Sequence, residues 1–133
     1  MGRERTQAVI CADTSSIARY LDGENGHDVN LVAAAIEDES LVLSPITVTE
    51  LLSYTGARPL LEPLIRNAPV LPITEGFWER AGLMRCRIRQ RGLKAKLADT
   101  LIAQCCIDAR APLIAHDPDF RHFAEHCGLK LVA

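Results

Sequence analysis

Four acidic side chains stand at comparable places along the 133-residue chain. Asp13 and Asp117 each follow a short apolar run, and Glu50 and Asp99 each lie near the start of a predicted helix. Carboxylate oxygens, with water and substrate phosphate, are the ligands that Mg²⁺ and Mn²⁺ prefer. Two such ions can stabilise both the attacking and the leaving oxygen of a phosphodiester. If the four acids converge, the sequence predicts a divalent-metal site that activates water for phosphodiester hydrolysis.

Other cofactor chemistry finds little support in the sequence. It contains neither a G-x-G-x-x-G pattern nor a Walker A pattern. His122, Glu125 and His126 match the H-x-x-E-H pattern of one zinc peptidase class. A catalytic zinc needs a third ligand, usually well downstream, and only seven residues follow His126. We therefore interpret these histidines as lying on a surface helix.

The first acid has the clearest structural setting. Residues 9–11 are apolar and predict a short buried strand, which Asp13 ends. Thr14 or Ser15 is then the predicted N-cap of the following helix. This places Asp13 at the carboxyl end of a strand, the edge at which open α/β sheets bind their ligands.

The remaining chain alternates short apolar runs with longer helical patterns, which predicts an α/β domain with a parallel sheet. Further strands are expected at 41–43, 112–115 and 129–132, with a weak one at 70–71. Helices are expected from 28 to 36, 47 to 56, 60 to 65, 75 to 92, 98 to 110 and from 118 onward. Apolar residues make up 48% of the chain and mean hydropathy is +0.06, so we expect apolar surface that a partner covers.

Charge is distributed unevenly along the chain. Residues 80–96 contain seven Lys or Arg and no Asp or Glu, whereas the rest carries eight basic against 17 acidic residues. A solvated helix face is the ordinary explanation of such a run, but its position just before Asp99 favours contact with phosphates. The predicted nucleic-acid-binding residues are Arg80, Arg85, Arg87, Arg89, Lys94 and Lys96. Aromatic residues are only 5% of the chain, and Trp78, off the apolar stripe, is the one candidate for base stacking or a protein interface.

Four stretches resemble the motifs of PIN-domain ribonucleases, and most of all the VapC toxins of bacterial toxin–antitoxin pairs. They are VICADTS (9–15), TVTELL (47–52), ADTLIA (98–103) and IAHDPDF (114–120), and together they span nearly the whole chain in the expected order. The resemblance implies a PIN-like three-layer α/β/α fold with a small central parallel sheet. It also implies an Mg²⁺-dependent (or Mn²⁺-dependent) endoribonuclease that a VapB-type antitoxin inhibits and that commonly forms a homodimer.

The same resemblance assigns roles to individual residues. Asp13, Glu50, Asp99 and Asp117 match the family's acidic positions and are the expected catalytic metal ligands. Asp119 matches a more variable accessory acid, and Thr14 is a second accessory candidate.

The chain departs from the family pattern at its start. Such toxins usually begin almost at their first strand, whereas residues 1–7 here form a polar extension before a single predicted domain, 8–133. The chain contains neither a signal peptide nor an apolar run of membrane length. Its five cysteines lack a C-x-x-C pair. We therefore expect a cytoplasmic protein with reduced thiols.

Each acid also has a purely structural interpretation. Thr47 and Glu50 have the spacing of a capping box, and Asp99 would complement a helix dipole in a first turn. Asp117 and Asp119 would serve as helix N-caps.

Two other functions remain open at this point. One is a phosphomonoesterase that uses Asp13 as its nucleophile, although such enzymes typically carry a second acid two residues on, where Ser15 stands. The other is a non-catalytic PIN-like binding module with a degenerate site, against which the presence of all four acids argues.

Overall fold

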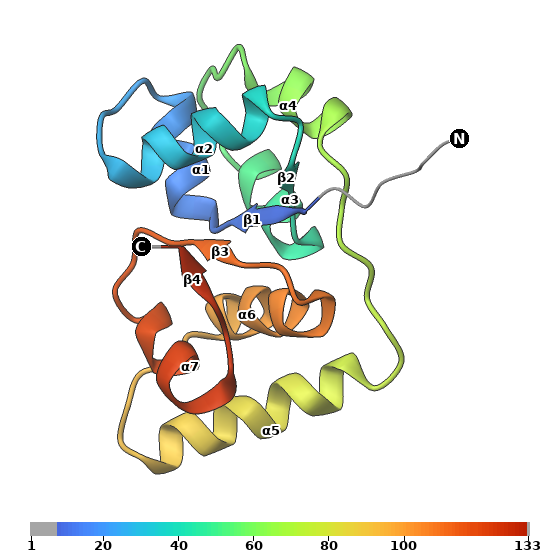
Figure 1. Ribbon diagram of the computed structural model, residues 1–133, viewed down its shortest axis with the longest axis vertical. Helices are drawn as coiled ribbons and strands as arrows, with labels where there is room; N and C mark the ends of the chain where they lie inside the picture. Colours follow the sequence, from blue (N-terminus) through green and yellow to red (C-terminus); the bar gives the residue numbers. More distant parts are fainter. Residues whose placement is uncertain (1–7, 133) are drawn as a thin grey trace.

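A parallel sheet of four short strands lies between two layers of helices in the computed structural model, which describes residues 8–132 (Figure 1). The strands are β1 (Ile10–Ala12), β2 (Leu41–Val42), β3 (Leu113–Ile114) and β4 (Leu131–Val132), in the order β2-β1-β3-β4. β1 is central and pairs in parallel with both β2 and β3. The predicted α/β/α architecture is confirmed. The polar extension at 1–7 lies outside the described residues.

The two helical layers divide the chain into halves. The first half forms one layer from α1 (Thr14–Leu21), α2 (His27–Glu37), α3 (Pro45–Leu52) and α4 (Leu61–Asn67). The second half forms the other from α5 (Phe77–Gln90), α6 (Leu97–Ala109) and α7 (Phe120–Cys127). Because each strand has helices on both faces, its residues are apolar without alternation, as parallel sheets require.

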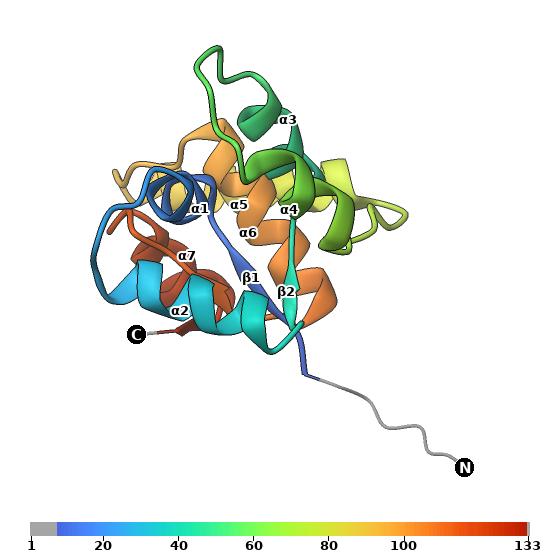
Figure 2. The ribbon, with the colours of Figure 1, turned by 90° about the horizontal axis from the view of Figure 1, so that it is seen from above.

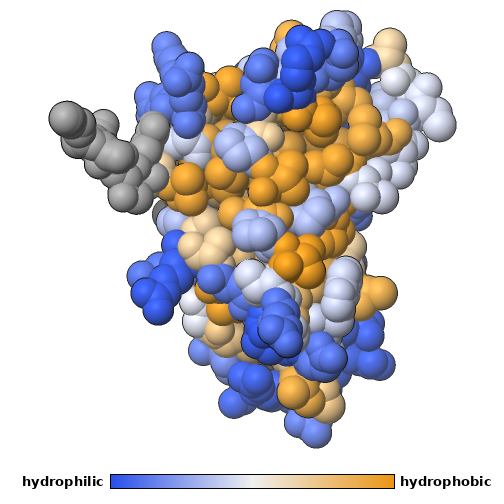
Figure 3. Space-filling model, turned by 90° about the vertical axis from the view of Figure 1, so that its right-hand side faces the viewer, coloured by the Kyte–Doolittle hydropathy of each residue, from blue (hydrophilic) through white to orange (hydrophobic). Residues whose placement is uncertain are grey.

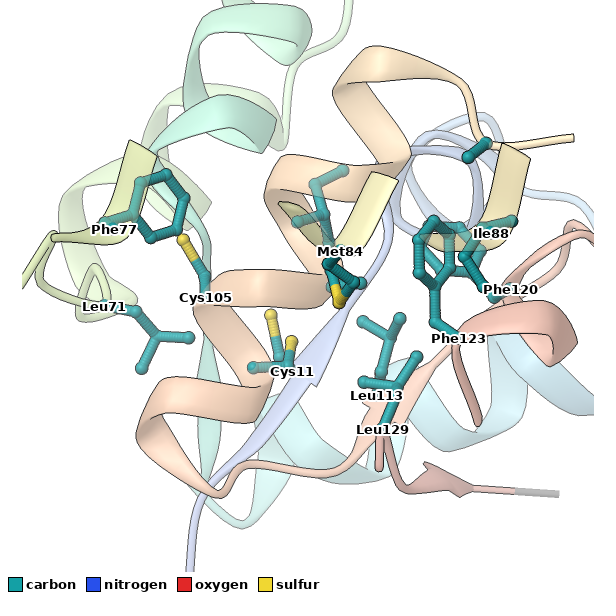
Figure 4. Packing of buried hydrophobic residues seen from close by; sticks show 14 of the residues in the cluster. Cys11, Leu71, Phe77, Met84, Ile88, Cys105, Leu113, Phe120, Phe123 and Leu129 are labelled. Atoms are coloured by element: carbon teal, nitrogen blue, oxygen red, sulfur yellow. The ribbon is translucent and has the colours of Figure 1, made fainter. Parts of the chain in front are cut away.

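Each face of the sheet has its own hydrophobic cluster. Cys11 packs with Met84, Phe120 and other residues of the second half, whereas the next residue, Ala12, packs with Ile17 and other residues of the first half. Figure 4 shows Cys11 pointing from β1 toward Met84 of α5. This buried centre fixes the position of β1 and of the acid that follows it.

Several helix starts differ from the sequence-based predictions. Asp13, not Thr14 or Ser15, is the N-cap of α1. α3 starts at Pro45, not Thr47, because the Ser44 hydroxyl accepts a hydrogen bond from the Thr47 amide at 3.0 Å and proline suits the first helical position.

Two other helix starts and one weak strand also differ from the predictions. α7 starts at Phe120, two residues after the proline that was expected to open it. α2 follows Gly26, so Asp28 lies within its first turn and does not cap it. The weak strand at 70–71 is only an isolated parallel bridge between Leu43 and Val70.

Candidate metal centre

The four predicted acids lie at one edge of the sheet, where the strands end. Asp13 follows β1, Asp117 follows β3, Glu50 lies on the helix after β2, and Asp99 lies in the first turn of α6. Asp99 interacts electrostatically with each of the other three acids. Figure 2 shows α1 and α3 at this edge, seen from above. Strand direction therefore gathers acids that are up to 104 residues apart in the sequence.

Asp13 is the most firmly positioned of the four acids. Its side chain is 2% exposed, and Oδ1 accepts a hydrogen bond from the Ser16 amide at 2.8 Å. Oδ2 accepts from the Ser15 hydroxyl at 2.9 Å and from the His116 amide at 3.3 Å. The last bond comes from the segment that follows β3, so Asp13 joins two strand ends.

Glu50 is positioned by hydroxyl groups. Thr14 Oγ1 donates to Glu50 Oε1 at 2.5 Å and lies 3.0 Å from Thr47 Oγ1, which in turn lies 3.1 Å from Ser44 Oγ. Because α3 starts at Pro45, Glu50 lies in the second turn of the helix, and the capping-box interpretation is wrong. Thr14, an accessory candidate, thus touches a predicted ligand.

Asp99 is the acid least suited to its surroundings. Oδ2 is buried and has no hydrogen-bond partner among the described residues. Burial raises the pKa of Asp99 to about 6, Asp117 and then Asp13 and Glu50 add to the rise, and Lys96 opposes it. A carboxylate that served only the helix dipole would be stabilised in its charged form. Here the surroundings disfavour the negative charge of Asp99, as expected of a carboxylate whose charge a bound cation would balance.

Asp117 completes the group and links it to the α7 turn. Oδ1 accepts a hydrogen bond from the Asp119 amide at 2.9 Å, and Oδ2 lies 3.6 Å from Lys96 Nζ. Asp119 occupies the N-cap position of α7, although within the described chain its carboxylate makes no capping hydrogen bond. The Asp119 backbone is therefore bonded to the group through Asp117, whereas its carboxylate does not cap the helix.

The donor chemistry of the group fits Mg²⁺ or Mn²⁺. All four candidate ligands offer oxygen, and Oδ2 of Asp99 is a buried acceptor that receives no hydrogen bond from the part of the chain that the structure describes. Across residues 8–132, no three His, Cys, Asp or Glu side chains stand close enough to share an ion as they are placed. Glu50 is exposed and Asp117 is partly exposed, so both carboxylates would be accessible to an ion.

Two of the predicted nucleic-acid-binding residues, besides Lys96 with its contact to Asp117, are engaged within the protein. Arg80 Nη2 lies 2.6 Å from Asp108 Oδ2, and this ion pair raises the pKa of Arg80. Arg85 Nε donates to the Ala95 carbonyl at 2.7 Å and so fastens the loop between α5 and α6. The remaining four candidates are exposed on α5 and this loop: Arg87, Arg89, Lys94 and Lys96.

Sequence reasoning missed the groups that position the acids. The Ser15 hydroxyl and the His116 amide both hold Asp13, and Ser44 and Thr47 extend the contact at Thr14. A serine two residues after an N-cap aspartate was a readable signal. The His116 contact depends on the pairing of β1 with β3 and has no local signal.

Comparison with known proteins identifies the family. The PIN domain model matches residues 10–126. The chain belongs to the PIN domain family. No curated protein matches it in sequence. The described helices include none that is both long and apolar enough to cross a membrane.

Solved structures share this PIN fold. VapBC2 from Rickettsia felis, bound to a promoter DNA fragment, matches with a TM-score of 0.73 and 18% identity over 93% of this chain and 97% of that one. VapBC-1 from nontypeable Haemophilus influenzae matches with a TM-score of 0.72 and 20% identity over 93% and 96% of the two chains. VapBC-5 from Mycobacterium tuberculosis, a member of the VapBC family of toxin-antitoxin systems, matches with a TM-score of 0.66 and 16% identity over 95% of this chain and 98% of that one. At these identities the likeness concerns the fold.

Proposed function

We propose that this PIN domain is a divalent-metal-dependent endoribonuclease and the toxin of a VapBC-type pair. The observation that carries the proposal is Asp99, whose buried Oδ2 has no hydrogen-bond partner in residues 8–132 and whose pKa three other carboxylates help to raise. A cation at this position would remove both penalties at once.

The chain's own residues divide the work at this centre. Asp13, Glu50, Asp99 and Asp117 would hold one or two Mg²⁺ or Mn²⁺ ions, which supply an activated water and stabilise charge on the phosphate. The hydrogen bonds from Ser15, Ser16 and His116 to Asp13, and from Thr14 to Glu50, orient two of these ligands. Asp119 and Thr14 remain accessory candidates.

The surrounding positive charge favours a nucleic acid as the substrate, and we propose that this nucleic acid is RNA. Lys96, 62% exposed and 3.6 Å from Asp117, is placed to meet a phosphate at the rim of the acidic group. Arg87, Arg89 and Lys94 are also exposed, on α5 and the loop after it. Phosphate contacts of this kind supply affinity without sequence specificity.

The phosphomonoesterase alternative has weaker support. The second acid that such an enzyme typically carries two residues after its nucleophile is replaced by a serine here. Ser15, at the place of the expected second acid, donates to Asp13.

A protein partner is proposed on the apolar surface. A groove of about 710 Å³ lies among α1, α2 and α4 and is lined mainly by apolar side chains, with Ile36 and Leu64 among them. Figure 3 shows apolar side chains gathered on the adjacent face, and Leu60 and Val70 are about half exposed. Surfaces of this kind mark protein interfaces. We assign the groove to a VapB-type antitoxin and propose that the toxin forms a homodimer and acts in the cytoplasm.

The direct test is to incubate the purified protein with defined RNAs, with Mg²⁺ or with chelator. Cleavage should require the metal and should disappear in Asp99→Asn. Expression alone should arrest growth, and co-expression of the cognate antitoxin should relieve the arrest. Cleavage by Asp99→Asn at the parent rate would overturn the proposed centre.

A further inference from the structure

Two helices of this fold end on a charged residue at a position that favours glycine. α1, α2, α5 and α6 all end with the same pair of hydrogen bonds, in which two successive amides donate back to carbonyls of the last turns. At the end of α2, the Glu39 amide donates to the Ile36 carbonyl at 3.1 Å, and the next amide donates to the Ala35 carbonyl at 2.9 Å. The first of the two donors has a left-handed backbone in each helix, which glycine adopts without steric cost and other residues do not. These four residues are Gly23, Glu39, Gly92 and Arg110.

The helix that it ends explains Arg110 but not Glu39. The last turn of a helix carries a partial negative charge, which a cation stabilises and an anion opposes. Arg110 therefore favours α6, whereas Glu39 disfavours α2. The two residues before Glu39, Glu37 and Asp38, are also acidic, so repulsion adds to the cost. Within residues 8–132 the Glu39 carboxylate makes neither a hydrogen bond nor an ion pair that would offset it.

Glu39 lies at the apolar groove among α1, α2 and α4. Of the described residues that line this groove, Glu39 is the only charged one, and its neighbours there include Ile36, Leu41 and Leu60. The residue is exposed in the protein alone, so water solvates its carboxylate. Because Glu39 precedes β2, it lies at the amino ends of the strands, the edge opposite to the four acids. Its presence therefore concerns the groove and not the proposed metal centre.

A partner that fills an apolar groove also covers the charge at its wall. Removing a carboxylate from water is unfavourable unless a cation or another donor replaces the water. The occupant must therefore combine an apolar face with a Lys or Arg that reaches Glu39. The same carboxylate repels phosphates and other carboxylates, so neither RNA nor a fatty acid suits this groove. An amphipathic protein segment with a basic residue has both features that the groove requires.

We propose that Glu39 is a specificity residue for the antitoxin, and that it pairs with a Lys or Arg of the antitoxin segment whose apolar face packs into the groove. The inference rests on the proposed function and adds to it the residue that gives the groove its charge preference. A left-handed glutamate at the end of α2 lowers the stability of the free toxin. The ion pair in the complex then accounts for its presence, because it rejects partners that lack a cation at this point.

Thermal melting of the protein alone tests the premise without a partner. Glu39→Gly should raise Tm by about 3–5 °C, because it removes both the left-handed side chain and the opposing charge. Arg110→Gly is the matched control: it relieves the same backbone strain but loses a favourable charge, so its Tm should rise less. A Glu39→Gly variant that melts below the parent would give Glu39 a structural role and would overturn the proposal.

Binding of the antitoxin encoded beside the gene for this chain, measured by titration calorimetry, tests the pairing itself. Glu39→Gln keeps the size of the side chain and removes its charge, so Kd should rise about tenfold, the scale of one charged hydrogen bond. Glu37→Gln removes an exposed acid that belongs to the same helix end but does not line the groove, and it should bind like the parent. Leu60→Ala shortens an exposed apolar side chain of the groove and should also weaken binding. Thermal melts check that each variant is folded.

Three results would overturn the role of Glu39. The first is parent-like affinity in Glu39→Gln while Leu60→Ala binds more weakly, which would leave the groove to the antitoxin without the ion pair. The second is an equal loss in Glu37→Gln, which would make the effect one of net charge. The third is a change in self-association of Glu39→Gln with unchanged antitoxin affinity, which would assign the groove to a second copy of this chain. A parent protein that neither binds this antitoxin nor cuts RNA would instead overturn the proposed function, and the inference with it.

Discussion

The end of β1 and the start of α6 each contribute a carboxylate to the same edge of the sheet, but the two carboxylates have opposite relations to the fold. Asp13 accepts hydrogen bonds from three donors and caps α1. Asp99 has a buried oxygen that no donor of the described chain reaches, and its pKa is raised to about 6. Both helix starts offer a positive dipole end, so the difference comes from local donors and neighbouring acids.

This contrast separates structural from functional placement. The stability of the fold explains Asp13 even without a ligand, because an N-cap carboxylate stabilises its helix. The fold gains nothing comparable from Asp99, so its presence is best explained by what it binds. Residues whose local setting costs stability are those for which a functional explanation is most needed.

The largest expected effect is on catalysis, where the two acids should not differ. Asp13→Asn and Asp99→Asn should each lower the cleavage rate by ~100-fold or more, because each removes a charged ligand from a centre that stabilises the transition state. The measurement is single-turnover cleavage of a defined RNA at saturating Mg²⁺. Normal activity in Asp13→Asn would reduce that residue to a helix cap.

Stability without metal should separate the two acids. At neutral pH in chelator, Asp13→Ala should lose about 0.5–2 kcal/mol of unfolding free energy with its cap. Asp99→Asn should gain on the order of 2–3 kcal/mol, the equivalent of a pKa raised from 3.8 to about 6. Thermal melts should therefore shift in opposite directions.

Mg²⁺ supplies the control for these melts. The ion binds only the folded protein, so the parent should gain about 2.7 kcal/mol at a hundred times the dissociation constant. Asp99→Asn should show a much smaller gain. If this variant melted below the parent in chelator and kept the full Mg²⁺ shift, the centre would be assigned to the wrong residues.

The pH dependence of the unfolding free energy tests whether ionisation of Asp99 causes the predicted stability difference between the parent and Asp99→Asn. Its folded pKa, about 6, exceeds the ordinary value of 3.8, so the folded state holds this proton more tightly than the unfolded state. Unfolding free energy should therefore fall as pH rises from about 4 to about 6, and Asp99→Asn should lack that fall. The pKa values of Asp28 and Asp108 are lowered, so their contributions are lost only at lower pH.

Denaturant melts at pH 4, 5, 6 and 7 in chelator measure this difference. The quantity to follow is the parent's unfolding free energy minus that of Asp99→Asn, because other groups cancel in the subtraction. If this difference in unfolding free energy stayed constant from pH 4 to 7, ionisation of Asp99 would not destabilise the fold, and the prediction would be wrong.

The sequence predicted what depends on local pattern and strand direction. Apolar runs located the strands, and the parallel arrangement brought the acids to one edge. Helix starts were less certain, because Ser44 and Thr47 are both suitable caps and only the backbone path selects Ser44. Contacts between distant segments had no local signal. Arg80 looks like a free cation until α6 places Asp108 beside it, and Thr14 reaches Glu50 only after α1 and α3 pack.

The smallest expected effect is on the salt dependence of RNA binding. It bears on whether the substrate reaches the centre from the side of Asp99 or from the side of Asp13. Arg87, Arg89 and Lys94 are exposed, and all three precede α6, the helix that carries Asp99. RNA phosphates should therefore lie on the α6 side of the centre. For single strands, each lost phosphate contact lowers the slope of log affinity against log salt by about 0.7. Arg87→Gln with Arg89→Gln should thus lower it by about 1.4, measured by RNA binding in chelator to prevent cleavage.

Arg80→Gln is the matched control for this slope, because Arg80 belongs to the same basic run but pairs with Asp108. It should leave the salt dependence of RNA binding unchanged, although the protein loses an ion pair. Unfolding free energy should confirm that the double variant remains folded, since both of its arginines are exposed. Equal slopes for the parent and the double variant would make this helix face a solvated surface, and the substrate would then have to approach Asp99 from another side.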